Sequence, residues 1–306
     1  MRLALVLVLI AASSGCDIGK LTVGTTSKVL VRGRVALQQE SDYELARQAI
    51  PGALKTIESF WIVDPDNGNL IRLLTEGYCQ YGTGFAEDDW EAARLAKDLR
   101  AAEYYNEHTT KIFTRCLNYA LRSLGKRWER DLFGNDATVA ALLRDQGGRG
   151  RRFAMMYAGL ALGSLINHNL TRIEMLGYLP TVELLLNHVI ELDKKKPPKD
   201  LVHAALPYIA LGMVHTGRPA ALGGEPDRAR RYFEEALRIT GGKFLLARSL
   251  MAYRVGLAKD DRKFFHDQLK QVLETAPSVW PEQRLANEIA HRKARRYLSK
   301  EKELFP

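Results

Sequence analysis

The 306-residue sequence has few of the residues that interrupt or cross-link a chain. It contains 11 prolines and 24 glycines, so long uninterrupted elements can form, and its three cysteines are too few for a disulfide framework. With 46% hydrophobic and 26% charged residues, the composition excludes a disordered, collagen-like or multi-span membrane chain. The net charge of +9 suits nucleic acid, anionic lipid or an acidic protein as a partner, and selects none of them.

The sequence also lacks the short motifs of common enzyme chemistry. It has no H-E-x-x-H zinc motif, no G-x-S-x-G nucleophile turn, no Walker loop and no glycine-rich dinucleotide motif. Its seven histidines are scattered, and no two of them lie at metal-ligand spacing with a third ligand nearby. The run Glu87-Asp88-Asp89 is acidic, but carboxylates at a helix start typically offset the helix dipole. We expect no catalysis, cofactor or metal, and keep an unrecognised acidic active site as an alternative.

The N-terminus has the pattern of a targeting signal. Arg2 precedes ten apolar residues, Leu3 to Ala12, a helix of only about 15 Å, half of a bilayer's hydrocarbon core. Small residues leading into Cys16 resemble a bacterial lipobox, although Ser13 stands where Leu is usual. We expect residues 1–15 to be a signal peptide and Cys16 to be acylated, which places the mature chain on the periplasmic side and excludes nucleic acid as a partner. The alternative is an ordinary secretory signal that leaves Cys16 as a free thiol.

The mature chain divides into a lead-in and a helical body. Residues 16–40 carry little pattern, and the β-branched stretch 29–35 is either part of a lipidated tether or the lead-in to the first helix. From Ser41, which has a capping-box spacing to Glu44, apolar residues recur three and four positions apart. Residues 41–306 are therefore predicted to be all-α.

Helix pairs recur within this body. Three of them end near Asp193, Thr240 and Ala276, with spacings of 47 and 36 residues, against roughly 34 in tetratricopeptide repeats. Residues 229–237 also have the small-aromatic-small order of a repeat's second helix. The sequence predicts a tetratricopeptide-like helical-repeat array, an α-α superhelix, and a plain helical bundle is the alternative.

Two basic segments and one apolar segment stand out. Residues 147–152 read as a flexible loop of glycine and arginine, and the following helix, Arg152 to Asn167, is apolar all round and therefore buried. The basic run 292–296 on the last helix is expected to face solvent or anionic lipid headgroups.

Aromatic residues gather in the first third of the chain. In a repeat protein they usually fill layers between helices, but some could line a ligand cavity. His168 either ends the apolar helix Arg152 to Asn167 or is a polar group at the mouth of a pore. Cys79 and Cys116 lie within helical patterns and either form a disulfide or stay as two buried thiols. The candidate ligand-binding residues are Tyr78, Tyr81, Phe85, Trp90 and His168.

Several segments together resemble one known family. They are A-L-K-T-I-E-S-F-W-I-V-D-P-D-N (53–67), E-G-Y-C-Q-Y-G-T-G-F-A-E-D-D (76–89), M-Y-A-G-L-A-L-G-S-L-I (156–166), L-G-G-E-P-D-R-A-R-R-Y-F-E-E-A-L (222–237) and P-E-Q-R-L-A-N-E-I-A-H-R-K-A-R-R-Y-L (281–298). Their order and spacing resemble the T-component lipoproteins linked to tripartite ATP-independent periplasmic (TRAP) transporters.

The resemblance implies a lipid-anchored helical protein with cryptic tetratricopeptide-like repeats. It further implies a homotrimer around a central pore, a periplasmic substrate-binding protein as partner, and hydrophobic or organic-acid ligands. The strongly basic charge and the arginines of 149–152 depart from the family pattern. The expected function is a non-catalytic scaffold or ligand-handling subunit of a solute uptake system, with a general adaptor for envelope assembly as the alternative.

Overall fold

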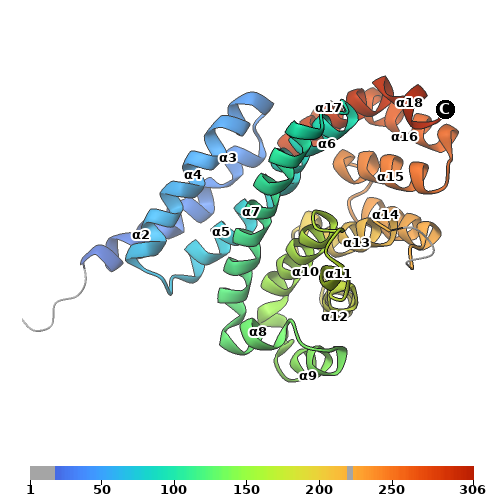
Figure 1. Cartoon of the computed structure of the whole chain (residues 1–306). Helices are drawn as coiled ribbons and strands as arrows, with labels where there is room; N and C mark the ends of the chain where they lie inside the picture. Colours follow the sequence, from blue (N-terminus) through green and yellow to red (C-terminus); the bar gives the residue numbers. More distant parts are fainter. Residues whose placement is uncertain (1–17, 219–222) are drawn as a thin grey trace, which may run out of the picture.

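The computed structural model describes residues 18–218 and 223–306, and the segment 1–15 and Cys16 lie outside these residues (Figure 1). Within the described ranges every regular element is helical, which confirms the all-α prediction. The α-helices are α2 (Ile18–Gly33), α3 (Val35–Gln38), α4 (Tyr43–Val63), α5 (Gly68–Tyr81), α6 (Glu87–Leu95), α7 (Leu99–Leu124), α8 (Lys126–Asp131), α9 (Asp136–Gln146), α10 (Arg152–Asn167), α11 (Ile173–Leu176), α12 (Leu179–Lys195), α13 (Leu201–Thr216), α14 (Pro226–Ile239), α15 (Leu245–Ala258), α16 (Arg262–Glu274), α17 (Arg284–Ser299) and α18 (Glu301–Leu304).

Asp and Asn side chains start many of these helices. The carboxylate of Asp42 accepts the backbone N–H groups of Glu44 and Leu45, so Asp42, and not Ser41 as its spacing to Glu44 predicted, caps α4. Asn67 caps α5 in the same way, and Asp98 caps the long helix α7. Such side chains satisfy backbone donors that the helix itself leaves unpaired.

The segment before α4 is helical and packed. The helix α2 contacts both α4 and α5, and it buries Val23 and Ser27. The amide of Asn69 donates to Ser27 Oγ at 3.2 Å, which fixes α2 against the start of α5. Residues 18–33, where the sequence carries little pattern and left a tether and a lead-in open, are therefore a packed helix. The pattern is weak because threonines and glycine interrupt the apolar stripe of this helix.

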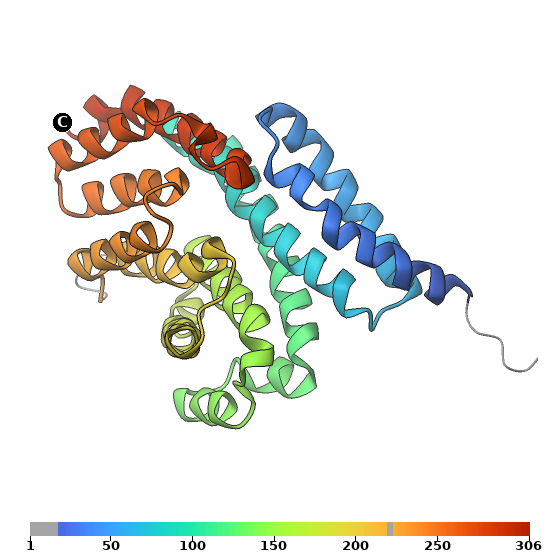
Figure 2. The same cartoon turned by 180° about the vertical axis from the view of Figure 1, so that it is seen from behind.

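From α4 onward, many helices pack on a neighbour in the chain, α5 and α10 also pack closely on the long helix α7, and the helices follow a curved path (Figures 1 and 2). Successive contacts join α4 to α5, α12 to α13, α13 to α14, and α15 to α16. At α14, Ala229, Phe233 and Ala236 are buried, and a Cβ on Gly212 of α13 would lie 2.6 Å from the Phe233 ring. Small residues thus permit the close helix approach that the repeat prediction requires, and this packing is consistent with a repeat array.

The curved array returns to its beginning. The last long helix, α17, contacts α3 and α4, and it lies beside α6 in both views (Figures 1 and 2). In the interior, α10 contacts α5, α7, α12 and α13. This position explains why α10 is apolar all round, as the sequence indicated.

Candidate functional site

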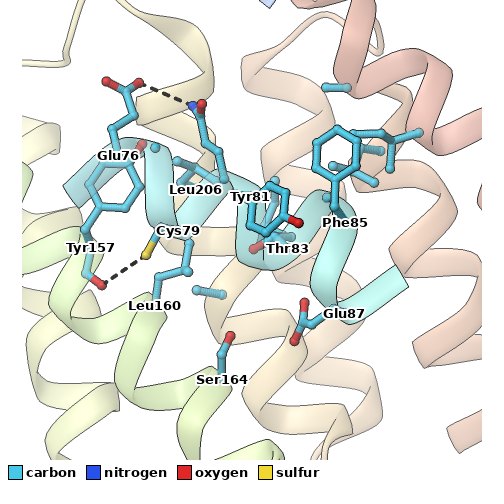
Figure 3. Close-up of a pocket in the computed structure, with 18 of the residues that line it drawn as sticks. Glu76, Cys79, Tyr81, Thr83, Phe85, Glu87, Tyr157, Leu160, Ser164 and Leu206 are labelled. Carbon is cyan, nitrogen blue, oxygen red and sulfur yellow. Dashed lines mark hydrogen bonds between the residues drawn. The ribbon is translucent and has the colours of Figure 1, made fainter. Parts of the chain in front are cut away.

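A cavity of about 470 Å³ lies inside the curve of the array. Side chains of α2, α4, α5, α10, α13, α15 and α17 line it, and most of them are apolar. Ser164 and Leu160 of α10 form part of one wall, opposite the turn that carries Tyr81, Thr83 and Phe85 (Figure 3). A cavity of this volume, with few polar groups, has the character of a small-molecule site.

The turn that faces the cavity is a π-helical segment, Gly82–Ala86, between α5 and α6. A Cβ on Gly82 would lie 2.8 Å from the Phe113 ring, so only glycine lets the turn approach α7 this closely. The extra residue in this turn changes the direction of the side chains that follow. Such π-turns occur often at functional sites. Here Thr83 and Phe85 of the turn, together with Tyr81 just before it, lie at the cavity.

Three of the five candidate ligand-binding residues come together at this cavity. Tyr81, Phe85 and Trp90 are lining residues. The Tyr81 and Phe85 rings stack with centroids 5.5 Å apart, and Tyr43 of α4 supports Phe85 at 5.0 Å. Tyr81 and Phe85 therefore form one aromatic part of the wall.

Tyr78 is not among the lining residues. Its hydroxyl donates to Glu58 Oε1 at 2.8 Å, and its ring stacks on Tyr119 with centroids 5.9 Å apart. Burial and the hydrogen bond to the Glu58 carboxylate raise the pKa of Tyr78, so it stays a neutral donor. Tyr78 therefore holds α4 against α5.

His168 lies at the end of α10, behind the wall. Its side chain is 0% exposed, with Nδ1 2.7 Å from Asn106 Oδ1 and Nε2 3.2 Å from Glu87 Oε1. Its ring packs edge-on against Trp90, centroid to centroid 4.4 Å. Since Glu87 and Trp90 both line the cavity, His168 positions two lining residues.

The acidic run and the basic run meet in a buried cluster between α6 and α17. Asp88 accepts from Arg296 Nη2 at 2.6 Å and from Arg292 Nε at 3.0 Å. Lys293 Nζ donates to Glu91 Oε2 at 2.5 Å, and Lys293 is only 2% exposed. The expectation that the basic run faces solvent or lipid was therefore wrong for Lys293 and Arg296. It failed because their partners lie on α6, far away in the sequence.

The segment 147–152 is also held by ion pairs. Arg152 is 6% exposed and binds Asp193 through Nη2 at 2.5 Å, and the same nitrogen donates to the carbonyl of His203. Arg149 donates to Asp193 Oδ1 at 3.0 Å. The prediction of a flexible basic loop was wrong, because Asp193 at the end of α12 binds both arginines.

The polar group that the sequence did not single out is Glu76 of α5. It lines the cavity, and Arg34 Nη1 donates to its Oε2 at 2.6 Å while His203 Nε2 lies 3.2 Å from its Oε1. Gln80 donates to the same carboxylate at 3.3 Å (Figure 3). A single acidic residue within the otherwise uncharged second half of α5, ahead of the aromatic turn, is the sequence signal that could have identified it.

Cys79 and Cys116 form a disulfide that joins α5 to α7. Both residues are almost fully buried, and Cys79 also lines the cavity. The sequence left a disulfide and two free thiols open, and the structure has the disulfide.

In the described parts of the chain, no group of three or more His, Cys, Asp or Glu side chains is arranged to hold a metal ion. None of the helices described is both long and apolar enough to cross a membrane.

The model of one protein family, the TRAP transporter T-component, matches residues 39–305, nearly the whole helical body. The chain belongs to this family. A search of curated proteins gives no match. Family membership confirms the resemblance drawn from the sequence motifs, and it associates this T-component with TRAP transport. The aromatic turn and the α6–α17 cluster lie within the matched residues, and so does most of the cavity lining; the lining residues between Val29 and Gln38 precede them.

Proposed function

We propose that this T-component is a periplasm-facing, lipid-anchored subunit that handles a ligand for a TRAP-type uptake system. In this proposal it has no catalytic role, assembles as a homotrimer and docks a periplasmic substrate-binding protein. Membership of the family supports the association with transport.

The observation that carries the proposal is the apolar cavity. Its walls come from helices at both ends of the array, so the curvature of the fold creates it. Each of its three carboxylates, Glu76, Glu87 and Glu91, is bound to a neighbouring basic side chain. A carboxylate committed in this way is a poor general base, whereas apolar walls with few polar groups suit reversible binding.

Docking is testable by co-purification. We expect the full-length, membrane-extracted protein to be isolated together with a TRAP solute-binding protein, because a helical-repeat surface presents many side chains to one partner. The measurement is affinity purification followed by mass spectrometry, with Tyr81→Ala as a variant that alters the cavity and leaves the outer surface unchanged. Recovery with outer-membrane assembly machinery, and without any solute-binding protein, would instead support an adaptor for envelope assembly.

Anchoring is testable at Cys16, which lies two positions before Ile18, the first residue of α2. We expect Cys16→Ser to move the protein from the membrane fraction to the soluble periplasmic fraction, because the variant lacks the thiol that carries the acyl chains. Immunoblotting of the two fractions measures this change, and Ser59→Ala, at an exposed residue of α4, is the control for an unrelated substitution. Retention of the Cys16→Ser protein in the membrane fraction would contradict acylation at this residue.

A further inference from the structure

A second cavity, of about 410 Å³, adjoins the apolar one. The two share Trp90, Glu91, Gly217, Arg218 and Arg254 as lining residues, so they meet along the wall between α6, α13 and α15. The second cavity has a different chemical character. Its ionisable lining residues are Arg94, Arg218, Arg254, Tyr253 and a single carboxylate, Glu91.

Glu91 cannot by itself balance these arginines, because its hydrogen bonds are made to α17. It accepts from Lys293 Nζ at 2.5 Å, from Arg296 Nη2 at 2.9 Å and from the Tyr297 hydroxyl at 2.6 Å. Burial favours the neutral acid, but the charges of Lys293, Arg296 and Arg254 outweigh it and lower the pKa of Glu91. Glu91 is therefore ionised and bound to α17.

The arginines are left short of partners. Arg254 makes no hydrogen bond or ion pair with any described residue, and its Nε is buried. Arg218 is 11% exposed and pairs with Glu183 through Nη2 at 2.9 Å, but its Nε is also buried without a partner in the described parts of the chain. Arg94 stacks over the Trp90 ring at 4.7 Å. A buried guanidinium N–H without an acceptor costs free energy, which an anion in this cavity would recover.

We propose that the two cavities together bind an amphiphile with one anionic head group. The head group, a carboxylate or a phosphate, lies between Arg254 and Arg218, with Arg94 at its outer side, and the apolar chain extends past Trp90 into the larger cavity. Arginine suits this role because its planar fork of donors matches both oxyanions. The inference rests on the proposed ligand-handling function and names the ligand class.

The experiment is calorimetric titration of the delipidated protein with four probes below their micelle concentrations. Decanoate and decyl phosphate carry both parts of the proposed ligand, decanol has only the chain, and inorganic phosphate has only the anion. We expect both anionic amphiphiles to bind at least tenfold more tightly than decanol and inorganic phosphate. Arg254→Gln should weaken the binding of decanoate about tenfold or more and leave the affinity for decanol unchanged, because it removes one charge-assisted contact. Arg254→Lys should restore part of the affinity.

Arg248→Gln is the matched control. It removes the same charge from the same helix, but Arg248 lines neither cavity and donates to Gln268 and Gln271. We expect this variant to bind decanoate as the wild type does. Thermal unfolding of each variant checks that the fold is intact, and the loss of Arg254 breaks no hydrogen bond within the described residues.

Equal affinity for decanoate and decanol would overturn the inference. An equal decrease in the affinity for both ligands in Arg254→Gln would also overturn it. Tight binding of inorganic phosphate alone would point to a simple anion site and also overturn it. Preference for only one of the two anionic amphiphiles supports it and identifies the head group. If the protein co-purifies with a solute-binding protein but shows no charge-selective binding, the ligand inference is wrong and the proposed function stands. If it binds the anionic amphiphiles selectively but co-purifies with no solute-binding protein, the proposed function is wrong and the ligand inference stands.

Discussion

Removing the Cys79–Cys116 disulfide should lower the free energy of unfolding by about 4 kcal/mol. The bond closes a loop across 37 residues, and cross-links of this span restrict the unfolded chain by roughly that amount. It also joins α5 to α7, the two helices that support the aromatic turn. We expect Cys79→Ala/Cys116→Ala to show this loss in urea unfolding, measured in a Cys16→Ser background.

Reductant is the control for this prediction. It should destabilise the disulfide-containing protein to nearly the level of the double variant, and it should have no effect on the double variant itself. An unchanged midpoint for the Ala pair would contradict a stabilising role. Because structural disulfides persist in oxidising compartments, a disulfide-dependent fold also agrees with the proposed periplasmic location.

Asp88→Asn should destabilise the protein by about 3–5 kcal/mol. Asp88 is fully buried and neutralises Arg292, Lys293 and Arg296. The uncharged amide of Asn would remove a negative charge that these cations need. Adding Lys293→Met should recover part of the loss, because Glu91 would then balance one buried cation, Arg296, instead of two. Urea unfolding measures both variants. Asp267→Asn, in an exposed pair with Lys263, is the control and should be nearly neutral.

The pH dependence of stability gives a second measurement of this cluster. Burial opposes ionisation of Asp88, but Lys293, Arg296 and Arg292 outweigh it and hold its pKa well below the usual range. A carboxyl with a lowered folded pKa stabilises the protein above its unfolded pKa, about 4, and loses that contribution as the pH falls toward the folded value. We therefore expect wild-type stability to fall below about pH 4, and to fall less steeply in Asp88→Asn. Parallel pH profiles would contradict this assignment.

The sequence predicted the helices well where the pattern is local. The interval Arg152 to Asn167 coincides with α10, because apolar periodicity acts over short distances. The sequence did not predict α2, because the apolar stripe of this helix is weak. It also failed for the charged segments, since the partners of Lys293 and Arg152 lie on distant helices and no local pattern identifies them.

The candidate site was predictable in part for the same reason. Aromatic clustering identified Tyr81, Phe85 and Trp90, which line the cavity. Tyr78 belongs to the same aromatic group, and His168 was a helix-end candidate, but their side chains bind Glu58 and Asn106. Arg254 carried no signal at all, since an arginine on a helix is ordinary until its neighbours are known.

The ion pairs between α6 and α17 join residues 202 to 208 positions apart. A linear repeat array can nucleate anywhere and grow by local contacts, but this closure needs both ends of the chain. The cavity wall is therefore incomplete until the last long helix is available. If the chain is exported unfolded to the proposed periplasmic location, the proposed binding site would form only after translocation is finished.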